Sequence, residues 1–160
     1  MRILGTIHFR PDTLQYLIDS GHWILIFVIS LIYGGSEDSD FAPFALVFSG
    51  LLFIFLIMSY ISLRRKLFIL SEETLIYERG IFNRRADYIE LYRVIDFREE
   101  QSFLQQLCGL KTVIIFSGDR TTPQLTIPGL HHKEDLIHEL RQRVEYNKTR
   151  RGVYEITNRY

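Results

Sequence analysis

Basic side chains provide the clearest candidate chemistry in this sequence. Arg64, Arg65 and Lys66 directly follow a long apolar segment, and a second group, Arg84 and Arg85, comes early in a predicted strand. Near an anionic lipid surface each such cation contributes about 1 kcal/mol of attraction. We therefore predict that the first group contacts lipid headgroups. The second group contacts either a ligand or partner, or carboxylates on neighbouring strands.

No catalytic motif accompanies these cations. The sequence lacks GxSxG, P-loop, GxGxxG, HExxH and CxxC patterns. Its adjacent carboxylates, Glu72-Glu73 and Glu99-Glu100, fall in a predicted turn and on opposite faces of a predicted strand, so neither pair lines one cleft. The single cysteine, Cys108, precedes Gly109 in a predicted turn and is interpreted as a small buried thiol. We predict that the protein is not an enzyme and binds no cofactor.

Two groups containing histidine could bind ions. His131, Asp135 and His138 have the spacing of one face of a predicted helix and could present three ligands to a metal, but a solvated helix face is the preferred interpretation because no second ligand set follows. Asp19 and His22 could form a proton or ion relay in a small membrane enzyme or transporter. The preferred alternative places them in an interfacial first helical turn. We predict no metal site.

The apolar composition predicts two membrane-spanning helices. The stretch from Phe41 to Ser62 has no ionisable side chain, and at about 1.5 Å per residue it covers roughly 33 Å as a helix, enough for a bilayer's hydrocarbon core. The uncharged run from Trp23 to Tyr33 is too short alone, so its helix must begin near Leu14. A secretory signal peptide is the alternative there, but no A-x-A cleavage pattern follows. We predict a helical hairpin over residues 13–62, with helices at about 14–33 and 41–62.

The charge distribution predicts how the hairpin lies in the membrane. The chain has 19 basic and 19 acidic side chains, with a net charge of −3 before Leu63 and +3 from Leu63 onward. The connecting stretch from Gly34 to Asp40 has no Lys or Arg, whereas basic residues flank both outer helix ends. The positive-inside rule therefore predicts cytoplasmic N- and C-termini. The second half is only mildly basic and has no basic stripe with interleaved aromatics, so we predict no nucleic-acid partner.

The second half of the chain has a strand-like pattern. Short runs rich in Ile, Val, Phe and Tyr alternate with turn residues between Lys66 and Ile127, which is typical of an antiparallel sheet or barrel. From His131 to Tyr146 the apolar period becomes helical, with charges such as Arg143 placed on the other faces. We predict an α+β fold, in which the helical hairpin precedes an antiparallel β-barrel over residues 63–146 capped by a C-terminal α-helix. Residues 1–12 form a lead-in and residues 147–160 a polar tail, interpreted as disordered.

The order of these parts resembles the bacterial pleckstrin-homology (PH)-like family, in its membrane-anchored (YdbS-like) branch. The features that carry the resemblance are Arg10-Pro11 before the hairpin, L-x-x-x-x-G from Leu75 to Gly80, E-L-x-R-V from Glu90 to Val94, Gln101-Ser102 before a turn to Gly109, and Pro128 before the last helix. The resemblance implies a partly open barrel of about seven strands, a location at the cytoplasmic face of a bacterial inner membrane, no enzymatic activity and an undefined ligand.

One turn departs from the phosphoinositide-binding PH pattern. Ser71-Glu72-Glu73-Thr74 is acidic where those domains carry lysines and arginines, so it should repel a phosphorylated headgroup. We therefore predict a membrane-tethered module that binds or scaffolds a protein partner, or another copy of itself, with no small-molecule substrate. The alternatives are a sensor of anionic membrane lipids and, third, a subunit of a membrane enzyme or transporter.

Overall fold

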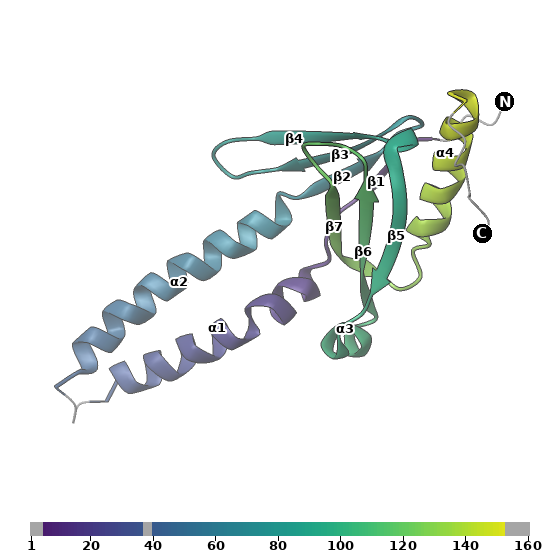
Figure 1. Cartoon of the computed structure of the whole chain (residues 1–160). Helices are drawn as coiled ribbons and strands as arrows, with labels where there is room; N and C mark the ends of the chain where they lie inside the picture. The colour runs from purple at the N-terminus through teal and green to yellow at the C-terminus, as the bar shows by residue number, and fades with distance from the viewer. Residues whose placement is uncertain (1–4, 37–39, 153–160) are drawn as a thin grey trace, which may run out of the picture.

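The computed structural model describes residues 5–36 and 40–152, and its first half is a long helical hairpin (Figure 1). Helix α1 spans Thr13–Gly34 and helix α2 spans Ala42–Arg64. Asp12 caps α1, since its side chain accepts a 2.7 Å hydrogen bond from the Leu14 N–H. Residues 37–39 of the expected connection between the two helices lie outside the described residues.

The two helices pack against each other and leave their apolar surfaces uncovered. The Tyr16 hydroxyl donates to the Leu56 carbonyl (2.9 Å) and the Ser30 hydroxyl donates to the Ala45 carbonyl (2.9 Å), which ties the pair at both ends. Only 11% of the most apolar window of α1 and 17% of that of α2 is buried. A core helix of a soluble protein would be mostly buried. The prediction of two helices long and apolar enough to cross a membrane is confirmed.

The second half is built from two antiparallel sheets, which we call the sheet domain together with the two helices that accompany them (Figure 1). One sheet has the strand order β1-β2-β3-β4 and the other the order β5-β6-β7. The α+β class and the closing helix are confirmed, but the described residues form two sheets and no closed barrel. The elements are β1 (Ile7–Phe9), β2 (Leu67–Leu70), β3 (Thr74–Arg79), β4 (Arg85–Glu90), the 3-10 helix η1 (Leu91–Arg93), β5 (Val94–Glu100), α3 (Phe103–Cys108), β6 (Leu110–Ser117), β7 (Gln124–His131) and α4 (Leu136–Arg150).

The core of the sheet domain lies between the inner faces of the sheets and α4. Alternate residues of each strand point inward, so Phe68 and Leu70 of β2 are fully buried whereas Leu67 and Ile69 are only partly buried. Leu136 and Leu140 of α4 complete this core. The other buried apolar side chains are Phe9, Leu75, Ile89, Leu91, Val94, Val113, Ile115, Leu125, Ile127, Leu130 and Val144.

The structure differs from the sequence predictions at three places, two that concern strands and one that concerns the start of the last helix. The lead-in contains a strand, because Ile7–Phe9 pairs with β2 in the register Ile7↔Leu70 and Phe9↔Phe68. Strand β7 continues through Pro128, which lacks an N–H to donate; β7 pairs only with β6 in the described part of the chain, so this proline occupies an edge strand. Helix α4 consequently begins at Leu136 rather than at His131.

Three further predictions change. Ser102 and Gln105 form a capping box that starts α3, a six-residue helix where a strand end and a turn were predicted, and Gly109 ends it with a φ of 66°. Arg143 is 1% exposed, not solvated. Helix α4 runs to Arg150 into the predicted tail, and the rest of that tail, residues 153–160, lies outside the described residues.

Candidate functional site

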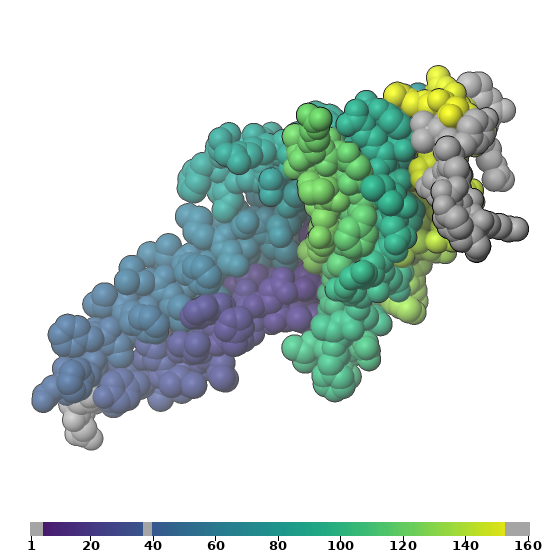
Figure 2. Space-filling view, in the orientation of Figure 1, coloured from purple at the N-terminus to yellow at the C-terminus, as the bar shows by residue number. Residues whose placement is uncertain are grey.

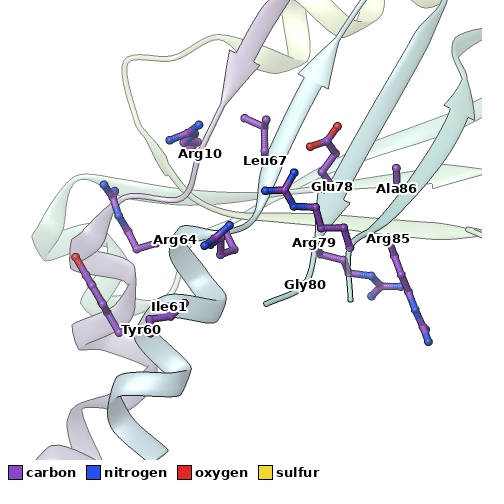
Figure 3. Close-up of a pocket in the computed structure, with 12 residues that line it drawn as sticks. Arg10, Tyr60, Ile61, Arg64, Leu67, Glu78, Arg79, Gly80, Arg85 and Ala86 are labelled. Carbon is purple, nitrogen blue, oxygen red and sulfur yellow. The ribbon is translucent and has the colours of Figure 1, made fainter. Parts of the chain in front are cut away.

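A pocket of about 650 Å³ lies where α2 meets the first sheet (Figure 3). Its lining comes from the segment before α1, from the last turns of α2, from the start of β2 and from the two ends of the β3–β4 connection. Among the described residues, six of those lining it are arginines and one is a carboxylate. We call it the arginine pocket; it is lined by Arg10, Tyr60, Ile61, Arg64, Arg65, Leu67, Glu78, Arg79, Gly80, Arg84, Arg85 and Ala86.

The end of α2 places two of these arginines. Arg64 lies in the last turn of the helix and Arg65 is its C-cap, where cations interact favourably with the negative end of the helix dipole. The Arg65 N–H donates to the Ile61 carbonyl (3.0 Å) and the Lys66 N–H donates to the Leu63 carbonyl (3.1 Å). Strand β2 begins at Leu67, directly after these bonds. The helix therefore passes into the sheet without a linker, which places its terminal arginines next to the start of β2.

The β3–β4 hairpin places three more arginines. Arg79 and Arg85 are direct cross-strand partners, and like charges at such positions destabilise a sheet. Asp87 offsets part of this repulsion through a 3.2 Å ion pair with Arg79. Figure 3 shows the Arg79 side chain extending toward the end of α2, whereas that of Arg85 points away from it. Because the strand begins at Arg85, Arg84 lies in the turn, not in the strand as predicted, so both residues line the same pocket.

Gly80 holds this turn in a conformation that other residues rarely adopt. Its φ is +116°, and a Cβ added there would lie 1.9 Å from the Asn83 carbonyl oxygen. We expect Gly80→Ala to destabilise the sheet domain by about 1–2 kcal/mol, because the turn must open to admit the methyl group. Thermal unfolding of the full chain measures this loss. Gly5→Ala, whose Cβ would meet no atom within 4 Å, is the control, and equal losses in both variants would contradict the expectation.

Tyr77 lies on β3 beside the arginine pocket. Its ring stacks on Phe68, with ring centroids 4.6 Å apart, and the Arg79 guanidinium lies 5.4 Å from its centroid. Burial raises the pKa of the Tyr77 hydroxyl above its ordinary value. The hydroxyl is therefore protonated at neutral pH and can donate a hydrogen bond to a ligand in the adjoining pocket that it lines with Lys66 and Asn83.

The two predicted basic groups thus meet at one site. Arg64 and Arg65 lie with Arg84 and Arg85 in the arginine pocket, whereas Lys66 lines the adjoining pockets. Sequence reasoning missed two arginines as site residues: Arg10, which it used for membrane orientation and for the family resemblance, and Arg79. The position of Arg79, one residue before the turn that leads to Arg84 and Arg85, was a signal for its membership of the group.

The histidine candidates do not assemble into a site. His131 ends β7, and its Nε2 lies 3.2 Å from the Asp12 carboxylate at the start of α1. Asp135 caps α4 by accepting from the His138 N–H (3.2 Å), and the His138 ring contacts Gln142. Within residues 5–36 and 40–152, no group of three or more His, Cys, Asp or Glu side chains could hold a metal ion.

The remaining candidates have structural partners. The Asp19 carboxylate accepts from the Gln15 amide (2.8 Å), and the His22 ring packs 5.0 Å from that of Trp23. Three carboxylates of the adjacent acidic pairs form separate ion pairs: Glu99 with Lys111 at 3.1 Å, Glu100 with Arg98 at 3.6 Å and Glu73 with Arg150 at 2.6 Å. Cys108 ends α3 and is half-buried rather than lying in a turn.

Comparison with known proteins identifies a family. A protein-family model described as "Bacterial PH domain" matches residues 17–148. The matched range begins inside α1 and ends inside α4, so it includes the helical hairpin as well as most of the sheet domain. No curated protein sequence matches the chain significantly.

Proposed function

Because the chain belongs to the bacterial PH domain family, we propose that it is a non-catalytic, membrane-tethered module that binds the headgroup of an anionic phospholipid in the arginine pocket. The observation that carries the proposal is the gathering of six arginines and one carboxylate at the end of a helix long enough to cross a membrane. Guanidinium groups bind phosphate oxygens in pairs of charge-assisted hydrogen bonds. The sheet domain then lies on the cytoplasmic side, where anionic lipid headgroups attract basic residues.

The lining of the arginine pocket favours a lipid over a free phosphate. Tyr60 and Ile61 belong to the membrane-length helix α2 and line the same pocket as the arginines. A phosphate held by the arginines therefore leaves its acyl chains beside α2, where the apolar surface is uncovered. The charged headgroup of a lipid therefore meets the arginines, and its acyl chains meet the apolar surface of α2.

The acidic turn that argued against a phosphorylated ligand lies away from this pocket. Strand β2 leaves the end of α2 at Leu67 and reaches Ser71 at its far end, so the β2–β3 turn and the β3–β4 turn lie at opposite ends of the sheet. Glu73 of the acidic turn is paired with Arg150. The repulsion predicted from the sequence therefore acts far from the arginine pocket.

A protein partner or second copy is the second candidate. Strand β4 pairs only with β3 in the described ranges, so its outer edge offers backbone groups for pairing, and Tyr88 on this strand is 59% exposed. An added strand from a partner would meet this edge.

The lipid proposal is tested on the full chain in a neutral detergent. We expect phosphatidylglycerol to raise the melting temperature by several degrees, since saturation at about 100 times Kd stabilises a protein by about 2.7 kcal/mol. Phosphatidylcholine with the same acyl chains is the control, and glycerol phosphate tests the headgroup alone. Salt at 1 M should weaken the effect, because it shortens the Debye length to about 3 Å. Equal shifts with both lipids would overturn the proposal, whereas an equal shift with glycerol phosphate would assign the pocket to free phosphates.

A further inference from the structure

Helix α3 presents an uncovered apolar face on the sheet domain. Phe103 is 73% exposed, Leu107 is 71% exposed and Leu104 is half exposed, although the helix has only six residues. Figure 2 shows α3 as a projection from the domain next to the domain end of the helical hairpin. Large apolar side chains gathered in this way on a protein surface mark a contact with a membrane or a partner.

The opposite face of α3 is attached to the first turn of α1. The Gln105 amide donates to the Gln15 side-chain oxygen (2.9 Å) and to the Thr112 hydroxyl (2.8 Å). Gln105 and Gln15 are 5% and 4% exposed, so this link is buried. The start of α1 is itself held by the sheet domain, since the Asp12 N–H donates to the Gly129 carbonyl (2.9 Å). Helix α3 is therefore fixed at the level where α1 begins.

A second exposed apolar side chain lies on the other side of the hairpin. Phe82, in the β3–β4 turn, is 90% exposed. Figure 1 shows this turn extending over the domain end of α2, in the direction in which the hairpin leaves the domain. Arg84 and Arg85 follow Phe82 in the chain, so an apolar tip is backed by cations, the arrangement found in elements that lie in a membrane interface.

We propose that α3 and Phe82 insert into the interfacial layer of the bilayer on either side of the hairpin and fix the sheet domain against the membrane. The occupant of both apolar surfaces is the lipid surface, because each surface lies beside a membrane-length helix whose own apolar surface is uncovered. Helix α3 is attached to the first turn of α1, and the turn that contains Phe82 extends over the domain end of α2 (Figure 1). This inference rests on the hairpin spanning the membrane and is independent of what the arginine pocket binds.

Cys108 gives a direct test, since it ends α3 and is the one cysteine of the sequence. The full chain is spin-labelled at Cys108 and reconstituted in bilayers of phosphatidylcholine alone, so that no anionic lipid is available to the arginine pocket. The accessibility of the label to oxygen and to a water-soluble nickel chelate is then measured. The control carries the label at exposed Arg141 of α4, as Cys108→Ser with Arg141→Cys.

We expect the oxygen-to-nickel accessibility ratio at Cys108 to exceed that at position 141 by at least about threefold. A label at Phe82→Cys in the Cys108→Ser background should exceed the ratio at position 141 by the same factor. A smaller difference at either position overturns insertion of that element. Because a label can itself partition into lipid, the Leu104→Ser, Leu107→Ser variant labelled at Cys108 is a second measurement. Its ratio should fall to the control value, whereas Gln106→Ser should leave it unchanged. A ratio unaffected by the double variant also overturns the proposal for α3.

Discussion

Replacement of Arg64 and Arg84 by alanine together is expected to weaken binding of an anionic phospholipid about thirtyfold. The two residues come from α2 and from the β3–β4 turn and line the same pocket. Each substitution removes a cation that contributes about 1 kcal/mol near an anionic headgroup. The sum of about 2 kcal/mol corresponds to an increase of about thirtyfold in Kd. Titration of the full chain with phosphatidylglycerol in neutral detergent, followed by the shift in melting temperature, gives the affinity.

The matched control is the pair Arg120→Ala and Arg141→Ala. Both residues are exposed, and neither lines the arginine pocket. The control lowers the net charge by the same amount, so a general electrostatic attraction would be reduced equally in both double variants. Equal losses of affinity would contradict a defined binding site.

The Arg64→Ala, Arg84→Ala variant should be as stable as the unmodified chain when no lipid is bound. Arg79 and Arg85 face each other across β3 and β4, and four further arginines line the same pocket, so the empty pocket carries electrostatic repulsion. Removal of two cations relieves part of it. We expect the melting temperature of the lipid-free Arg64→Ala, Arg84→Ala variant to equal or exceed that of the unmodified chain. A large decrease would show that the arginines serve the fold instead of a ligand.

Local pattern was sufficient to predict some of this molecule. The uncharged run from Phe41 to Ser62 predicted α2 within two residues, because a long apolar helix needs no distant partner to be recognised. The basic groups at Arg64–Lys66 and Arg84-Arg85 were also visible as local clusters. The meeting of Arg64 and Arg65 with Arg84 and Arg85 in one pocket was not visible, because it depends on β2 and β3 pairing in a register that brings the end of α2 to the β3–β4 turn.

Features that depend on contacts between distant parts of the chain could not be predicted from local sequence. Strand β1 has three residues, too few to show alternation, and it exists because it pairs with β2 about sixty positions later in the chain. Arg143 follows the helical pattern of a surface charge, yet it is buried because carbonyl groups from other segments meet its guanidinium. Tertiary partners determine both the formation of β1 and the burial of Arg143, and local periodicity carries no information about such partners.

Arg143 is the basis of the second large prediction. Its guanidinium donates to the Leu70 carbonyl (3.0 Å), to the Ser71 carbonyl (3.3 Å) and to the Gly5 carbonyl (2.9 Å). Helix α4 is thus attached both to the end of β2 and to the segment before β1. The Glu139 carboxylate, 3.6 Å away and one turn earlier on α4, offsets the buried charge.

We expect Arg143→Met to destabilise the sheet domain by about 3 kcal/mol, because methionine fills much of the volume of the arginine stem but leaves the Leu70 carbonyl buried without its donor. For a domain of this size, that loss lowers the melting temperature by roughly 15 °C. Thermal unfolding of the full chain in detergent measures it. Arg141→Met, at an exposed position of the same helix, should change the free energy of unfolding by less than about 0.5 kcal/mol. A loss at position 143 no greater than that at 141 would show that the buried guanidinium does not hold α4 on the sheets.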